Sequence, residues 1–217
     1  NVVAIDGPAG AGKSTVSRLV AEKLGLDVLD TGAMYRCVAW AALFELGDVS
    51  DPADVARVAA AARVEQVGTR WIANGVDVTE TIRGVEVTAA VSVVAAQPAV
   101  RARLVELQRA WLDERGGGVV EGRDIGSVVV PDACLKVYLD AEPTARATRR
   151  AREKAGGAEI SERDTTAELA SLNERDRLDS TRTVSPLVQA PDAVVLDTTV
   201  LSIDEVVDAI VDLWRER

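Results

Sequence analysis

The clearest chemistry in this sequence lies in one glycine-rich segment, Gly7-Pro8-Ala9-Gly10-Ala11-Gly12-Lys13-Ser14. It fits the pattern Gly-x-x-x-x-Gly-Lys-Ser/Thr, and it lies between an apolar β-branched run and a stretch with helical periodicity, as this chemistry requires. The glycines let backbone N–H groups surround a polyphosphate at a helix N-terminus, Lys13 reaches the β- and γ-phosphates, and the Ser14 hydroxyl can bind Mg²⁺. The alternative is a turn without a ligand.

This phosphate loop, residues 7–14, recognises only phosphates and metal, so it does not identify the nucleotide base. Guanine-specific switches usually add two further sequences, DxxG and NKxD. The first is missing from the strand ends after the loop, and Asn173-Glu174-Arg175-Asp176 departs from the second at its lysine position. A GTP-dependent switch is therefore disfavoured.

Two other segments follow predicted strands, where open α/β folds bind their ligands. The segment Asp30-Thr31-Gly32-Ala33-Met34-Tyr35-Arg36 offers a hydroxyl and a guanidinium, and Glu121-Gly122-Arg123-Asp124-Ile125-Gly126 offers an arginine beside a carboxylate. The arginine can bind an anion, while the carboxylate accepts from an amino group or orients the arginine. The alternatives are a helix N-cap with a surface arginine for the first segment and a structural ion pair for the second.

A third group of charged residues lies on a predicted polar helix. Arg175, Asp179 and Arg182 are spaced i, i+4 and i+7, which places one carboxylate between two guanidiniums on a single helix face. They can contact one ligand together. The alternative is a solvated ladder of salt bridges, which contributes little to the stability of the fold.

A fourth group is an arginine cluster that precedes a flexible Gly156-Gly157 break. The pattern is typical of a hinged cationic lid over a phosphoryl group in transfer, with a solvated basic helix face as the alternative. The cluster comprises Arg146, Arg149, Arg150 and Arg152.

The elements that position these side chains alternate between strand and helix. Short β-branched runs predict buried parallel strands at 2–5, 27–29, 119–120, 134–139 and 193–196. Helices are expected at 14–24, 33–46, 52–62, 85–96, 98–114, 143–155 and 164–181, and a capping box at Ser202-Ile203-Asp204-Glu205 opens a last one. Alternating residues around Asn74-Gly75 predict a small antiparallel insertion with strands at 63–67, 70–73 and 76–78.

Composition excludes several classes of protein. The 217 residues are 47% hydrophobic, enough for a continuous core, and no stretch approaches the roughly 20 apolar residues of a membrane helix. The net charge of −10 opposes binding to nucleic acid. Because there is no histidine, Ser-His-Asp and Cys-His catalysis and histidine-bound metals are excluded. We expect Cys37 and Cys134 to be buried free thiols. We also expect the protein to be cytoplasmic and to have no secretory leader.

Taken together, the motifs at 7–14, 30–36, 122–126 and 174–176, with Arg182-Thr183-Val184-Ser185-Pro186-Leu187, resemble those of bacterial cytidylate kinases. The match covers nearly the whole chain. It implies one P-loop NTPase domain of α/β class, with a parallel sheet covered by helices, an antiparallel NMP-binding insertion and a short helical lid. Its parts would be a core at 1–50, 115–145 and 190–217, an NMP-binding region at about 51–114, a lid at about 146–164 and an acceptor-contacting helix at about 165–182.

The resemblance implies phosphoryl transfer from MgATP to CMP or dCMP, giving ADP and CDP or dCDP. Lys13, Arg123 and Arg149 would be the catalytic residues, and Ser14 would bind Mg²⁺ together with the ATP phosphates. ATP would contact Gly7, Pro8, Ala9, Gly10, Ala11, Gly12, Lys13, Ser14 and Thr15. CMP would contact Thr31, Arg36, Ser92, Arg101, Arg123, Asp124, Arg175, Asp179 and Arg182.

Partners would then be small nucleotides only, namely ATP, CMP and dCMP, with no nucleic acid and no membrane. We expect a monomer that needs Mg²⁺ with ATP and no tightly bound metal or organic cofactor. Two alternatives stay open at this point. One is another small P-loop kinase with UMP or a hydroxy acid as acceptor, and the other is a binding module gated by a nucleotide.

Overall fold

The structure is a computed structural model that describes residues 1–217. The chain divides into two compact units, which are described separately. Unit 1 comprises residues 1–29 and 112–217, and unit 2 comprises residues 30–111. None of the helices is long and apolar enough to cross a membrane.

A five-stranded sheet with the order β2-β6-β1-β7-β8 organises unit 1. The central strand β1 runs parallel to both β6 and β7, and β7 runs parallel to β8. This sheet places the carboxyl ends of β1 and β6 side by side, since Asp6 is in register with Gly122. The strands are β1 (Val2–Asp6), β2 (Val28–Asp30), β6 (Gly118–Gly122), β7 (Leu135–Asp140) and β8 (Val194–Asp197).

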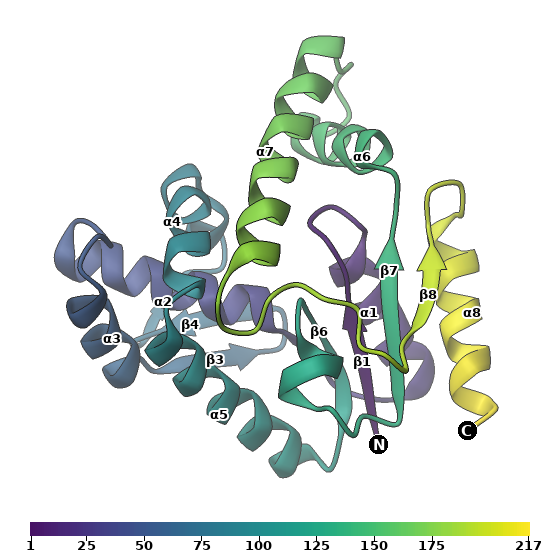
Figure 1. The fold of residues 1–217 in the computed structure, drawn as a ribbon, viewed down its shortest axis with the longest axis horizontal. Helices are drawn as coiled ribbons and strands as arrows, with labels where there is room; N and C mark the ends of the chain where they lie inside the picture. The colour runs from purple at the N-terminus through teal and green to yellow at the C-terminus, as the bar shows by residue number, and fades with distance from the viewer. The chain divides into compact units, whose positions relative to one another are not determined.

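Four α-helices belong to unit 1, and α6 and α7 lie side by side (Figure 1). Helix α6 ends at Gly156, which adopts a left-handed conformation with φ of 57°. Helix α7 begins with a capping box between Ser161 and Asp164. The four helices are α1 (Lys13–Leu24), α6 (Pro143–Ala155), α7 (Glu162–Thr181) and α8 (Ile203–Arg215).

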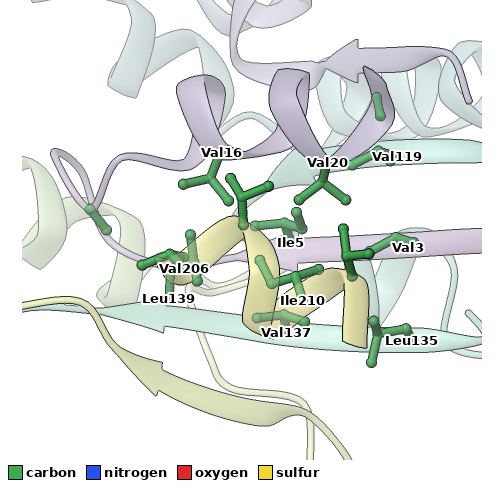
Figure 2. Packing of buried hydrophobic residues seen from close by; sticks show 14 residues of the cluster. Val3, Ile5, Val16, Val20, Val119, Leu135, Val137, Leu139, Val206 and Ile210 are labelled. Carbon is green, nitrogen blue, oxygen red and sulfur yellow. The ribbon is translucent and has the colours of Figure 1, made fainter. Parts of the chain in front are cut away.

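The core of unit 1 fills one face of the sheet. Val3 and Ile5 of β1 are both 0% exposed, and because side chains alternate along a strand they point to the same face. Helices α1 and α8 cover this face, where Val20 and Ile210 pack against the strand residues (Figure 2). This packing fixes the start of α1, and therefore the phosphate loop, above the carboxyl end of β1.

The opposite face of β1 carries Asp6, which neighbours a π-helical turn, η2 (Ile125–Val129). The Asp6 carboxylate accepts hydrogen bonds from the N–H groups of Ile125 and Gly126, both at 2.8 Å. The sequence did not predict this turn. It follows directly after β6 and fixes the path of the segment at 122–126.

Unit 2 combines helices with a three-stranded antiparallel sheet in the order β3-β4-β5. The predicted hairpin is confirmed, because Asn74 and Gly75 both adopt positive φ angles, 50° and 83°, between β4 and β5. The elements are α2 (Thr31–Leu46), α3 (Pro52–Ala61), β3 (Val64–Val67), β4 (Arg70–Ala73), β5 (Val76–Asp77), the 3₁₀ turn η1 (Thr81–Arg83), α4 (Val85–Ala95) and α5 (Pro98–Arg115), of which residues 112–115 fall in unit 1.

The predicted fold class is confirmed: an α/β fold with a parallel sheet covered by helices and one small antiparallel sheet. The predicted burial of both thiols is half right. Cys37 is buried, and burial raises the pKa of its thiol to about 12. Cys134 is free but exposed, because it lies in the turn before β7 rather than in the strand itself.

Candidate active site

The phosphate loop runs from the end of β1 to the first turn of α1. Gly12 occupies the N-cap of α1 with φ of 87°, and no side chain caps that end of the helix. Gly7 adopts φ of 148°, and a Cβ atom added there would lie 2.1 Å from the carbonyl oxygen of Leu139. Both positions therefore require glycine, for the left-handed conformation at Gly12 and for the close approach of β7 at Gly7.

Lys13 folds back over this loop. Its ammonium group donates to the carbonyl oxygens of Gly7 and Pro8, both at 2.8 Å, and the residue is 6% exposed. Burial lowers the pKa of Lys13 to about 7, and the nearby charge of Arg123 acts in the same direction. An anion bound in the loop would stabilise the charged form of this lysine.

Ser14 contacts a carboxylate that sequence reasoning missed. Its hydroxyl donates to Oε1 of Glu121, a residue of β6 that is 4% exposed. A hydroxyl beside a carboxylate is a donor set of the hard oxygen type that Mg²⁺ prefers, so these two residues fit the predicted metal. The signal in the sequence was the place of Glu121 near the end of a buried strand.

Asp6 positions the segment that carries Arg123 and Asp124. Its two backbone hydrogen bonds tie the end of β1 to the residues that follow Asp124. Burial raises the pKa of Asp6 to about 6, although the same two hydrogen bonds act in the opposite direction. Sequence reasoning missed this residue because it looked like an ordinary strand end.

A buried cluster of charged side chains lies beyond β6, and this cluster comprises Arg123, Asp124, Asp179 and Arg182. Arg123 Nε donates to Asp179 Oδ2 at 2.9 Å, and Arg182 lies 3.6 Å from Asp179 and 3.9 Å from Asp124. The side chains of Asp124, Asp179 and Arg182 are only 5–8% exposed. Arg123, which follows β6, is thus paired with Asp179 of α7.

This burial contradicts the solvated ladder considered as the alternative for the charged face of α7. Burial by itself would raise the pKa of Asp179, but Arg123 and two further arginines hold it below its usual value. Burial opposes the charge on Arg123, yet Asp179 raises the pKa of that guanidinium. The opposite charges of this buried cluster therefore stabilise one another.

The arginine cluster on α6 is divided between different contacts. Arg149, predicted to be catalytic, donates to the hydroxyl of Thr198 at 3.1 Å and to the carbonyl oxygen of Thr199 at 3.3 Å. Arg150 forms an ion pair with Glu153 at 2.7 Å. The catalytic role of Arg149 stays a prediction.

Unit 2 holds the remaining residues predicted to bind CMP. Thr31 is 3% exposed at the start of α2, where Asp30 forms the N-cap. Arg36 donates to the carbonyl oxygen of Ile82 at 2.9 Å and to the hydroxyl of Thr88 at 2.8 Å.

Arg101 is 2% exposed on α5, and its guanidinium lies 5.1 Å from the centre of the Tyr35 ring, a cation–π contact. It also donates to the carbonyl oxygen of Ala95 at 3.1 Å. Ser92 is half-buried on α4. Thr31, Arg36, Ser92 and Arg101 thus belong to unit 2, whereas the phosphate loop, Arg175 and the buried charged cluster belong to unit 1.

A family model and two sequence relatives indicate the same family. A family model described as cytidylate kinase matches residues 3–216. A bifunctional pantoate ligase/cytidylate kinase of Synechococcus sp. (strain WH7803) is 51% identical over 225 residues, which cover 100% of this chain and 45% of that protein. A cytidylate kinase of Mycolicibacterium paratuberculosis is 50% identical over 222 residues, covering 100% of this chain and 96% of that protein.

The chain therefore spans less than half the length of the bifunctional relative and nearly all of the mycobacterial one. Among solved structures, an uncharacterized protein from Eubacterium ventriosum matches with a TM-score of 0.53 and 12% identity. The match covers 100% of this chain and 99% of that chain, and it supports the fold alone.

Proposed function

The chain belongs to the cytidylate kinase family, and from this premise we propose that it transfers the γ-phosphoryl group of ATP to CMP and dCMP. In this reaction the bond between the γ-phosphorus and the β,γ-bridging oxygen breaks. A bond forms between that phosphorus and an oxygen of the acceptor phosphate, and the products are ADP and CDP or dCDP. The observation that carries the proposal is the phosphate loop together with the buried charged cluster in one compact unit.

On the donor side, Lys13 is the group we assign to the β- and γ-phosphates. Its ammonium already lies against two carbonyl oxygens of the loop, so a short movement would bring it to a bound polyphosphate. Ser14 and Glu121 would hold Mg²⁺, which offsets negative charge on the phosphates when it is bound. The backbone N–H groups at the start of α1, including those of Ser14 and Thr15, would bind the phosphate oxygens.

On the acceptor side, we assign the CMP phosphate to Arg123 and Arg36 and the ribose to Arg175 and Asp179. Asp124 and Arg182 would bind the cytosine ring, with Ser92, Arg101 and Thr31. Cytosine offers an amino donor at N4 and acceptors at N3 and O2, which suit a carboxylate with arginines. Uracil reverses the first two groups, so it would leave buried polar groups without partners.

The chemistry needs no general base. The attacking atom is a phosphate oxygen that is already ionised, so the absence of histidine is no obstacle. The work of the protein is positioning and charge compensation around the phosphoryl group, which Lys13, Arg123 and Arg149 would supply. Water must be kept from the phosphoryl group, and we assign this to the helix pair α6 and α7.

Replacement of Lys13 tests this assignment. We expect Lys13→Ala to lower turnover with CMP by about 10²-fold or more, by analogy with removal of one preorganised donor. A coupled assay of ADP formation measures it. The matched control is Lys23→Ala, since Lys23 lies on the same helix in an exposed ion pair with Asp208. A rate for Lys13→Ala near that of the control would contradict the assignment.

The two alternatives are not favoured. A hydroxy-acid acceptor and a slow nucleotide-gated module both leave the match to the cytidylate kinase family over residues 3–216 without explanation. We further propose that the protein acts as a monomer in the cytoplasm, with ATP, CMP and dCMP as its partners and Mg²⁺ as the only cofactor.

A further inference from the structure

Both polar groups of the Ala9 peptide backbone are bound by side chains from outside the phosphate loop. The N–H group of Ala9 donates to Oδ1 of Asp176 at 2.9 Å, and the carbonyl oxygen of Ala9 accepts from Nη1 of Arg146 at 2.8 Å. The same Nη1 atom lies 2.5 Å from Oδ2 of Asp176. The contacts form a closed ring through Ala9, Asp176 and Arg146, which fixes the orientation of both polar groups of that residue.

The two side chains come from different helices and are held in place themselves. Arg146 of α6 is 5% exposed, and its Nε atom donates to the carbonyl oxygen of Ala141 at 3.1 Å. The side chain of Asp176 on α7 is 17% exposed. Hydrogen bonds to charged groups are stronger than neutral ones, and more so where water is largely excluded. The ring is therefore a rigid contact between the loop and the two helices.

Apolar packing supports the ring from the side. Ala9, Ala147 of α6 and Leu172 of α7 form a small buried cluster, with Leu169 packed against it. An added Cβ atom at Gly10 would lie 3.3 Å from the Cβ of Arg146 and from Cδ1 of Leu172, so the next residue of the loop also fits closely under both helices. The top of the loop therefore lies directly against α6 and α7.

We propose that Arg146 and Asp176 are positioning residues that hold the phosphate loop, through Ala9, in the conformation that binds a nucleoside triphosphate. Neither residue touches the reacting atoms in this account. The identity of the nucleotide as ATP rests on the proposed function, whereas the positioning itself rests on the contacts at Ala9. Arg146 thus differs from Arg149, which we assign to the phosphoryl group, because Arg146 supports the loop.

The position of the ring also limits where the helix pair can move. Arg146 lies in the first turn of α6 and Asp176 in the C-terminal part of α7, so these parts of the two helices are attached to the loop. The Gly156-Gly157 break lies at the far end of α6. Any closing motion would then carry the far ends of the helices, while their bases stay with the loop.

The test compares conservative variants that keep size and most of the chemistry. Arg146→Lys keeps a positive charge but cannot bind Ala9, Asp176 and Ala141 at once, and Asp176→Asn places an amide donor against the guanidinium or against the Ala9 N–H. Isothermal titration with a magnesium complex of an unreactive ATP analogue, without acceptor, measures affinity. We expect each variant to bind about 10- to 100-fold more weakly, while KM for CMP changes less than about threefold.

Two exposed residues serve as matched controls: Arg177→Lys on α7 and Asp212→Asn on α8 should leave the affinity unchanged. The double variant Arg146→Lys/Asp176→Asn should bind the ATP analogue no more than about threefold more weakly than whichever single variant binds it less tightly, because both substitutions disrupt the same ring. Unchanged affinity with only a lower melting temperature would overturn the proposal, because it would show a purely structural role. Fully additive losses in the double variant would also overturn it.

These outcomes are separate from the proposed function. If the wild-type protein binds the analogue but does not phosphorylate CMP, the proposed function fails, and the affinities of the variants still decide whether the ring positions the loop.

Discussion

Nucleotide binding at pH 8 should be accompanied by uptake of a proton at Lys13. In the free protein, burial and Arg123 lower the pKa of this lysine to about 7. At pH 8, Lys13 is then protonated in about one tenth of the molecules. A polyphosphate bound beside Lys13 restores the positive charge of its ammonium group. We therefore expect uptake of about 0.9 proton per site when the nucleotide binds.

The assay is isothermal titration of an unreactive ATP analogue at pH 8 in two buffers with different ionisation enthalpies. The difference in observed binding enthalpy gives the number of protons taken up. The nucleotide contributes little, because its terminal phosphate, with a pKa of about 6, is already ionised at pH 8. Lys13→Arg is the matched control, since its guanidinium is charged at this pH in both states, so its uptake should be close to zero. Uptake below about 0.2 in the wild-type protein would refute the reasoning about Lys13.

Three further predictions concern the elements that position the site. Gly7→Ala should lower the free energy of unfolding by about 3 kcal/mol or more and abolish nucleotide binding, because the added Cβ would lie 2.1 Å from the Leu139 carbonyl oxygen. Urea denaturation measures the loss. In the control Gly68→Ala, where no atom lies within 4 Å of the added Cβ, the free energy of unfolding should fall by only about 1–2 kcal/mol. The pKa of Asp6 is raised to about 6 in the folded state, which therefore binds an extra proton below that pH. The stability of the wild type should fall by about 2 kcal/mol relative to Asp6→Asn as pH rises from 4 to 7. A flat difference across these pH values would contradict the burial of an ionisable Asp6. Ile210→Ala should lower the free energy of unfolding by about 2–5 kcal/mol and Ile210→Val by about 1 kcal/mol, as measured by urea denaturation, and equal losses would contradict the tight packing.

The features predicted well from the sequence are those fixed by local chemistry. The phosphate loop needs its glycines for backbone geometry, so the pattern alone places it between β1 and α1. The hairpin at Asn74-Gly75 is likewise decided by the two residues of the turn, which adopt the positive φ angles that they tolerate best. Capping residues such as Ser202 place the start of α8 for the same reason.

The features that the sequence did not reveal depend on contacts between distant residues. Ser14 meets Glu121 across 107 positions, and Asp6 meets the η2 turn across 119 or more. Neither pairing leaves a local pattern. Arg146 illustrates the same limit. The arginine-rich sequence of α6 predicts a basic helix face, whereas Arg146 itself is buried and contacts Ala9, 137 positions away.

The most direct test of the central claim is the acceptor dependence of ADP formation. The protein is incubated with Mg²⁺, ATP and, in separate reactions, CMP, dCMP, UMP, AMP, GMP or shikimate, with a control that lacks acceptor. We predict rapid ADP formation with CMP and dCMP and much slower formation with the other acceptors. ADP formation at the same rate in the control without acceptor, or with shikimate in place of CMP, would contradict the account.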